Sequence, residues 1–482
     1  MKIDHPAIDA VDVDAVPAPI GAEDVADLML SVLSNGLDHP ELWAMLPNLL
    51  AQAPDLPDVL YRRTHAANGI GASVSARLLL ALCGAVTDDP ATIIEVLTPL
   101  AADYSQSPLV QGVMFHLHAL LDPTNPKYAL TGSFCRIPFI QFDVLENTSH
   151  LCCASFLQTS AGDLSTTPWQ DVWNGPTAQA IRESIHDGSY RYCNKGACPQ
   201  IQGTNLPRAA EVAGMSDHWR HIVEGLVTEV PAGPENVNLA YDRTCNLSCP
   251  SCRVERYAAD DATRARYAAM QENTILPLLK NAKTVFITGS GDPFASKNFR
   301  SMMERLTAED YPDLRFQIMT NGMLFTPRQW DSFPALHGRV KVLKISVDAA
   351  TGPTHETLRR GARWPVMMEN MAFAGRLAAA GLIDEFELVF TVQTDNYREM
   401  GDAVDLASRV GATGIHFGRI TNWGTFSPEE YRAKAVFLPI HPEHGDFLAH
   451  MRDARLTDPI ALLNDLDEFL PDSVSAIRKY VY

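Results

Sequence analysis

The sequence predicts an α/β fold built around a parallel sheet, and three features of the 482-residue chain lead to this prediction. From residue 236 onward, short β-like apolar runs alternate with stretches of helical periodicity, which is the pattern of parallel α/β domains. Residues 22–121 instead carry apolar positions at helical spacing. Between these regions lies a loop-rich segment, residues 129–210, that contains five of the nine cysteines.

Six strands are predicted in the C-terminal region, at residues 237–241, 284–288, 314–319, 340–347, 385–392 and 414–419. Helices are predicted between them, near residues 260–280, 297–308, 327–336, 365–380 and 397–410. Since the strand-to-helix loops of such a domain gather at the carboxyl ends of the strands, we expect ligands to bind there. The residues beyond 420 are predicted to form loops and one or two helices.

The composition divides the chain into four predicted parts. A helical domain spans residues 1–128, and its first 20 residues are expected to be a disordered leader. A small domain spans residues 129–230, with a β-like run at 136–142 and an amphipathic helix at 177–186. Such a segment buries too little apolar surface to be stable without a further source of stability, such as a bound metal. The α/β core spans residues 231–425, and a C-terminal extension spans residues 426–482.

The formal net charge is −19, from 39 Lys and Arg against 58 Asp and Glu. So acidic a chain is repelled by phosphate, which argues against nucleic acids and anionic membranes as partners. The N-terminus lacks the basic and apolar regions of a signal peptide, and the longest apolar run, residues 78–86, is far too short for a membrane span. We therefore expect a soluble, cytoplasmic protein whose cysteines are metal ligands or catalytic groups rather than disulfides.

Three cysteines, Cys245, Cys249 and Cys252, follow the first predicted strand of the core with the spacing Cys-x3-Cys-x2-Cys. Three thiolates on one short loop can face a common centre. A structural zinc ion would need a fourth ligand from elsewhere in the chain. A [4Fe–4S] cube held by three cysteines leaves one iron for another ligand. The spacing, at the end of the first strand of a β/α domain, resembles the radical S-adenosylmethionine (radical SAM) superfamily.

This resemblance implies a partial (β/α)6 barrel of the TIM type, with a [4Fe–4S] cluster that binds S-adenosylmethionine (SAM). Further residues follow in the order that the family shows: Gly289, Gly291 and Asp292 in GSGDP, Asn321 in TNG, Ser346 and Asp348 in KISVDA, then Arg359 and Asn396. The resemblance implies that Asp292 accepts hydrogen bonds from the SAM ammonium, that Arg359 pairs with the SAM carboxylate, and that Asn396 meets the ribose or the carboxylate. Taken singly, each is also an ordinary turn, cap or surface residue.

One position departs from the family. Ser251 precedes the third cysteine, where the family often has an aromatic residue near the adenine. We therefore expect the adenine to pack against Tyr257 or against the sixth strand, around Ile415 and Phe417.

The second cysteine group comprises Cys135, Cys152, Cys153, Cys193 and Cys198. Together with Trp169, Trp173 and Arg182, it resembles the SPASM domain, an auxiliary iron–sulfur module that follows the barrel in most radical SAM enzymes but precedes it here. The resemblance implies one auxiliary [4Fe–4S] cluster with four cysteine ligands, and zinc is the alternative. Adjacent cysteines cannot easily ligate one cluster together, so we expect one of Cys152 and Cys153 to be spare. The spare thiol is either structural, a ligand of a second species, or a donor of a hydrogen atom to the substrate.

The resemblance implies an enzyme that reductively cleaves SAM to a 5′-deoxyadenosyl radical, which takes a hydrogen atom from the substrate. The expected substrate is a peptide or protein that undergoes oxidative modification. The alternatives are epimerisation or dehydrogenation of a sugar or other small molecule, and a non-catalytic metal-binding scaffold. An electron donor such as flavodoxin or ferredoxin is an expected partner.

Overall fold

The structure is a computed structural model that describes residues 108–470 apart from 123 and 126, together with residues 91, 94 and 98. The chain divides into two units, one of residues 1–101 and 113–123 and the other of residues 102–112 and 124–482. Helix α6 (Pro108–Leu121) confirms the last of the predicted N-terminal helices. The predicted leader and most of the predicted helical domain lie outside the described residues. No helix in the described part of the chain is long and apolar enough to cross a membrane.

The second unit is built on one curved sheet with the strand order β10-β9-β8-β7-β6-β5-β4-β1-β2-β3. Strands β4 to β9 are parallel neighbours in chain order, and each corresponds to one of the six predicted strands. Their bounds are β4 Asn236–Leu239, β5 Thr284–Ile287, β6 Arg315–Thr320, β7 Val340–Ser346, β8 Ile383–Val392 and β9 Gly414–Arg419. The predicted α/β class with a partial barrel is confirmed.

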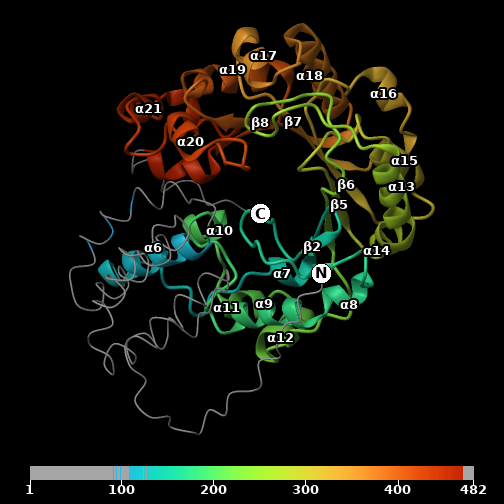
Figure 1. Ribbon diagram of the computed structural model, residues 1–482, viewed down its shortest axis with the longest axis vertical. Helices are drawn as coiled ribbons and strands as arrows, with labels where there is room; N and C mark the ends of the chain where they lie inside the picture. Colours follow the sequence, from blue (N-terminus) through green and yellow to red (C-terminus); the bar gives the residue numbers. More distant parts are fainter. Residues whose placement is uncertain are drawn as a thin grey trace, which may run out of the picture. The chain divides into compact units, whose positions relative to one another are not determined.

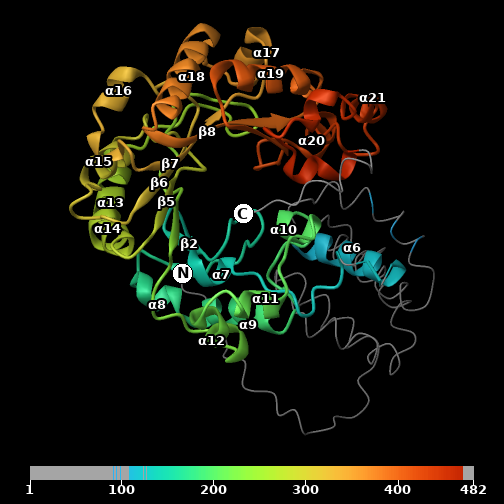
Figure 2. The same cartoon turned by 180° about the vertical axis from the view of Figure 1, so that it is seen from behind.

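Helices cover the outer side of this curved sheet (Figures 1 and 2). They are α13 Asp261–Met270, a π-helical turn at Gln271–Ile275, α14 Leu276–Leu279, α15 Lys297–Arg305, α16 Pro327–Asp331, α17 Gly352–Leu358, α18 Trp364–Ala379 and α19 Met400–Val410. All five predicted helical stretches are present. The short helix α17 was not predicted, because Pro353 and two threonines interrupt its apolar pattern.

The two faces of the sheet differ in chemistry, as β8 shows. Phe386, Leu388 and Phe390 alternate along the strand and are fully buried. The residues between them, Glu387 and Val389, lie on the opposite face, because successive side chains of a strand point to opposite sides. The outer face therefore packs apolar side chains under the helices, while the inner face also carries charged side chains such as Glu387.

The cysteine-rich segment extends this sheet. Strand β1 (Gln141–Leu145) pairs in parallel with β4, and β2 (Thr148–His150) and β3 (Gly162–Asp163) continue the edge as antiparallel strands. The prediction of a β-like run at 136–142 is wrong for its first part. Residues Ile137–Ile140 form the helical turn α7, because Pro138 fixes a helical φ in its first turn.

The rest of this segment consists of short helices: α8 Trp169–Trp173, α9 Pro176–His186, α10 Pro199–Gln202, α11 Ala209–Ala213 and α12 Asp217–Glu224. Helix α9 confirms the predicted amphipathic helix. From it, the buried Arg182 donates to the carbonyls of Pro138 and Thr228 at 3.0 and 2.8 Å, and its guanidinium lies 4.2 Å from the Trp173 ring centre. One side chain thus ties three loops of the segment together.

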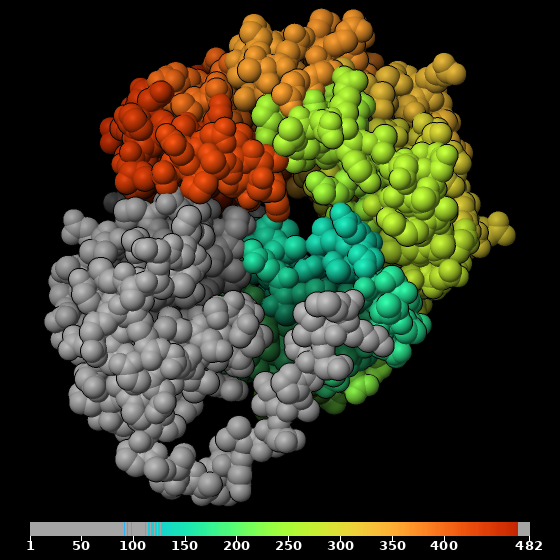
Figure 3. Space-filling view, viewed as in Figure 1, coloured from blue at the N-terminus to red at the C-terminus, as the bar shows by residue number. Residues whose placement is uncertain are grey.

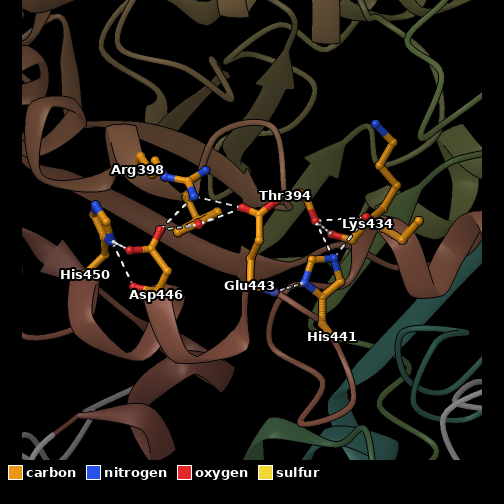
Figure 4. A network of polar contacts seen from close by, with 9 residues as sticks. Thr394, Arg398, Lys434, His441, Glu443, Asp446 and His450 are labelled. Carbon is orange, nitrogen blue, oxygen red and sulfur yellow. Dashed lines mark hydrogen bonds and ion pairs between the residues drawn. The ribbon is translucent and has the colours of Figure 1, made fainter.

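The C-terminal extension contains α20 (Pro428–Lys434), α21 (His444–His450) and the short strand β10 (Ala461–Leu462). A polar network joins α21 to the turn at Tyr397–Glu399 (Figure 4). In it, Tyr397 Oη lies 2.9 and 2.6 Å from carboxylate oxygens of Glu443 and Asp446, and Arg398 pairs with the same two carboxylates. Strand β10, which was not predicted, is too short to show a periodicity.

Candidate active site

A cavity of about 260 Å³ lies at the carboxyl ends of the parallel strands, where ligands were expected. It is lined by residues that end or follow each of the strands β4 to β9. Of the predicted site residues it contains Cys245, Cys249, Cys252, Gly289, Gly291, Asn321, Ser346, Asp348 and Arg359. In the space-filling view, a hollow is bordered by teal residues near β1, green residues that follow β4 and red residues that follow β9 (Figure 3).

The loop after β4 brings the three cysteines to the cavity. A bridge between Cys245 and Tyr257 closes the loop, and the amides of Cys252 and Arg253 both donate to the Cys249 carbonyl at 2.9 Å. Burial raises the pKa of the Cys245 thiol, and the nearby Asp292 carboxylate adds to this effect. Burial also raises the pKa of the Cys249 thiol, against the lowering effect of Arg359. Both thiols therefore need a metal centre to become thiolates at neutral pH.

Each of the three sulfurs accepts a hydrogen bond from a side chain. Asn321 Nδ2 lies 3.5 Å from Cys245 Sγ, and Arg359 Nη1 lies 3.7 Å from Cys249 Sγ. Arg253 Nη2 lies 3.4 Å from Cys252 Sγ. Arg253 was not predicted as a site residue, although its position directly after the third cysteine was a signal that could have been used.

The glycine loop after β5 has one open side and one crowded side. A Cβ at Gly289 would meet no atom within 4 Å, whereas a Cβ at Gly291 would lie 2.4 Å from the Asp242 carbonyl oxygen. Gly291 is therefore required for the close approach of this loop to the cysteine loop. Gly289 leaves room on the cavity wall for a ligand.

The structure does not place Asp292 where the ammonium prediction needs it. Its side chain is fully buried and is absent from the cavity wall. One carboxylate oxygen accepts from Thr320 Oγ1 and the Asn321 amide at 2.7 and 2.9 Å, and the other accepts from the amides of Phe294 and Ala295. Asp292 thus holds the loop after β6, which carries Asn321, against the loop after β5. Its carboxylate oxygens already accept four hydrogen bonds from these two loops.

Asn396 is likewise buried and does not line the cavity. The side chain is 1% exposed, and it donates to the carbonyls of Asp348 and Thr391 at 2.9 and 2.8 Å. It therefore supports the loop that carries Asp348, which has a left-handed φ of 55°. Asp348 in turn accepts from the Thr391 amide, and its other oxygen lies 3.2 Å from Arg359 Nε. This ion pair presents the Arg359 guanidinium to the cavity.

The residues expected to pack against the adenine of SAM do not line the cavity. Ile415 and Phe417 are fully buried on the outer face of β9, and Tyr257 does not line the cavity. Instead, Ile420 and Trp423, which follow β9, line it. Trp423 is 61% exposed. Sequence reasoning missed Trp423 because it lies in a loop, beyond the strand on which adenine packing was sought.

The five cysteines of the second group lie near one another, and their electrostatic neighbours differ. Burial raises the pKa of Cys152 well above its usual value, and Cys135, Cys198, Cys153 and Cys193 all lie close enough to raise it further. For Cys153, partial desolvation raises the pKa first, and the carboxylate of Asp143 on β1 comes next. In turn, burial and the nearby Cys153 raise the pKa of the Cys198 thiol. Cys152, which is affected by all four other cysteines, is the member of the pair that we propose as the auxiliary ligand.

Two family models match this chain, and each match contains one of the two cysteine groups. Residues 242–407 match the model of the radical SAM superfamily, and residues 135–199 match SPASM, an iron–sulfur cluster-binding domain. The chain contains a radical SAM domain and a SPASM domain. The SPASM domain precedes the barrel, as the sequence predicted. The two domains identify an enzyme of the radical SAM type and imply a [4Fe–4S] cluster, SAM and an auxiliary iron–sulfur cluster.

Among curated proteins, the AdoMet-dependent heme synthase of Nitratidesulfovibrio vulgaris is 26% identical over 177 residues. The match covers 36% of this chain and 45% of the relative, so it spans less than half of that protein. Among solved structures, Streptococcus suis SuiB bound to S-adenosylmethionine has 14% identity and a TM-score of 0.32, over 44% of this chain and 47% of SuiB. The structure of anSMEcpe with bound AdoMet has 17% identity and a TM-score of 0.29, over 38% of this chain and 50% of the other.

The residues of this radical SAM domain fit the group that the family implies. Cys245, Cys249 and Cys252 offer three sulfurs with N–H partners, and Gly289 leaves a stretch of wall open beside them. Within the described residues, no three His, Cys, Asp or Glu side chains are grouped as ligands of a single metal ion. Measuring the iron and zinc contents of the purified protein distinguishes an iron–sulfur cluster from a zinc ion.

Trp423 leads to the first prediction. If its ring stacks on the adenine, Trp423→Ala should lower SAM affinity by roughly 10- to 100-fold, because base–aromatic stacking contributes about 1–3 kcal/mol. Trp423→Phe, which keeps an aromatic face, should retain most of the affinity. Equilibrium binding of SAM to the iron-loaded protein measures both variants, and parental affinity in Trp423→Ala would contradict the assignment.

Proposed function

We propose that this protein reductively cleaves SAM and uses the product radical to remove a hydrogen atom from a bound substrate. When bound, the cluster supplies the electron, and SAM then yields methionine and the 5′-deoxyadenosyl radical. The observation that carries the proposal is the set of three cysteines, each paired with an N–H donor, at the rim of a cavity that ends a parallel barrel.

The chain's own residues then bind and orient SAM. Arg359, held by Asp348, offers a cation for the SAM carboxylate, and Ser346 offers a hydroxyl on the same side of the cavity. Trp423 covers the adenine. Together these groups fix the direction of the reactive carbon, which determines the substrate position that loses hydrogen.

The inner face of the barrel is the proposed place for the substrate. Lys344 on β7 and Glu387 on β8 are register partners, and their charged groups lie 2.9 Å apart. His416 on β9 lies 3.0 Å from the same Glu387 oxygen. Lys344 and Glu387 each stand two residues before a cavity-lining residue on the same face, Ser346 and Val389. Since a strand rises about 3.3 Å per residue, the charged group lies roughly 7 Å below the cavity.

The Glu387 carboxylate stays ionised at neutral pH. Burial alone would raise the pKa of Glu387, but the hydrogen bond from His416 and the charge of Lys344 lower it to about 2. A partly buried ion pair contributes little net stability compared with apolar side chains of the same volume. Its position beneath the cavity therefore favours a role in holding a polar substrate.

The double variant Lys344→Met/Glu387→Gln tests this role. Removing both charges together avoids leaving one of them unpaired. We expect the variant to form 5′-deoxyadenosine from SAM at the parental rate without substrate, but to form modified product at least tenfold more slowly. Lys341→Met, which removes an exposed charge near the start of the same strand, is the matched control and should behave as the parent. Equal product formation by the double variant and the control would rule out this substrate site.

A peptide or protein is the substrate class that we place first, because SPASM domains accompany peptide modification in many radical SAM enzymes. A small molecule is the second candidate, and the similarity to a heme synthase supports it. Incubation with peptides encoded beside the gene, and separately with small molecules made by neighbouring enzymes, distinguishes the two by mass spectrometry. Oxidative modification should lower the product mass by two hydrogens, whereas epimerisation leaves the mass unchanged and incorporates solvent deuterium.

The electrons have two proposed routes. A flavodoxin or ferredoxin supplies the electron for SAM cleavage, and the auxiliary cluster accepts one from the substrate radical when the outcome is oxidation. We also propose a cytoplasmic location, where such donors are reduced. The direct test of the whole function is anaerobic incubation of the reduced, iron-loaded protein with SAM. Methionine and 5′-deoxyadenosine are the expected products, and their absence from a fully loaded, reduced sample would contradict the proposal.

A further inference from the structure

The three N–H donors of the cysteine loop come from three separate parts of the fold. Asn321 follows β6, Arg359 follows α17, and Arg253 belongs to the loop itself. All three side chains are nearly buried, with residue exposures of 6%, 9% and 8%. In surroundings of low dielectric, such hydrogen bonds act more strongly than they would in water.

The donors act on the oxidation state that carries more negative charge. Reduction adds one electron to a cluster, and part of the added charge resides on its sulfurs. An N–H group that points at a ligand sulfur stabilises the reduced form more than the oxidised form, so it raises the reduction potential.

The three donors differ in net charge. Asn321 is a neutral dipole, and the charge of Arg359 is balanced by Asp348 at 3.2 Å. Arg253 donates to the carbonyls of Arg243 and Ser290 at 2.6 and 2.5 Å, and forms no ion pair with a carboxylate in the described part of the chain. Its full positive charge therefore acts on Cys252 from 3.4 Å.

We propose that Asn321, Arg359 and Arg253 are positioning residues that set the reduction potential of the cluster held by Cys245, Cys249 and Cys252, with Arg253 contributing most. The inference rests on the proposed function, because it takes these cysteines as cluster ligands. On this proposal, the residues around the cysteine loop set the reduction potential of the cluster as well as holding its ligands. The same arginine that joins the cysteine loop to the glycine loop also makes the cluster easier to reduce.

A redox titration followed by electron paramagnetic resonance tests this proposal on the full-length, iron-loaded protein. The signal that changes when SAM is added identifies the SAM-binding cluster, and the auxiliary cluster serves as an internal reference. We expect Arg253→Met to lower the reduction equilibrium constant at least tenfold, which is 59 mV for one electron. Arg253→Lys should keep most of the parental potential, and Asn321→Leu should shift it in the same direction by less.

Arg256→Met is the matched control, since Arg256 lies in the same stretch of chain, is exposed and has no sulfur partner. Its potential should equal that of the parent. If Arg253→Met loses iron, Arg253→Lys and Asn321→Leu carry the test. Parental potentials in the loaded variants would overturn the inference. A parent chain that takes up no iron at the three cysteines would instead refute the proposed function, so the two failures are distinguishable.

Discussion

Replacing Cys245, Cys249 and Cys252 with Ala is expected to remove about half of the iron and to abolish SAM cleavage. A chain with two [4Fe–4S] clusters binds about eight irons, of which four belong to this loop. The side chains of Asn321, Arg253 and Arg359 approach the three sulfurs through N–H groups, which cannot replace a thiolate as a ligand of iron. Iron and sulfide analysis after anaerobic reconstitution gives the first number, and chromatography of 5′-deoxyadenosine gives the second.

The complementary variant, with Cys135, Cys193 and Cys198 replaced by Ala, is the matched control. It should lose the other half of the iron and keep the SAM-dependent change in the paramagnetic signal. A colourless parent protein with stoichiometric zinc and no iron would end the radical SAM interpretation of the chemistry. Zinc in place of the auxiliary iron alone would correct only the second site.

The features that the sequence predicted well are those with local signals. All six barrel strands and the cysteine loop were placed correctly, because strand periodicity and cysteine spacing are properties of short stretches of chain. The addition of β1 to the edge of the barrel sheet could not be predicted. It depends on the pairing of residues 141–144 with residues 236–239, which are distant in sequence.

Two of the predicted SAM contacts do not line the cavity, for one physical reason. Asp292 and Asn396 occupy the expected positions in the chain, but their polar atoms are used by backbone groups of neighbouring loops. A motif gives the order of the residues and not the direction of each side chain. The same limit explains why Arg253 and Trp423 were missed, since their roles depend on which surface faces the cavity.

The choice between Cys152 and Cys153 has the second of the large expected effects. Cys152 lies with Cys135, Cys193 and Cys198, so Cys152→Ala should lose the auxiliary iron. Cys153 is more exposed and lies near Asp143, so Cys153→Ala should keep all of the iron.

The position of Asp143 indicates what Cys153 faces. Asp143 accepts a hydrogen bond from Asn238 of β4 at 2.7 Å. Asn238 alternates with Val237 and Leu239, which are buried on the helix side, so it belongs to the inner face of the sheet. Cys153, whose pKa is raised by burial and by the Asp143 carboxylate, therefore lies near a residue that contacts this inner face. This observation favours its role as a hydrogen-atom donor and gives epimerisation more weight than the sequence alone did.

If Cys153 is the donor, Cys153→Ala should form 5′-deoxyadenosine at the parental rate and still yield no epimerised product, because the substrate radical receives no hydrogen atom. In deuterated water, the parent should place one deuterium on the product carbon, because the thiol exchanges its proton with solvent before each turnover. Cys153→Ser keeps the size of the side chain but its O–H bond is too strong to donate, so it should behave like the alanine variant. Full iron content with full product formation in Cys153→Ala would make the thiol structural, and oxidation through the auxiliary cluster would then be the favoured outcome.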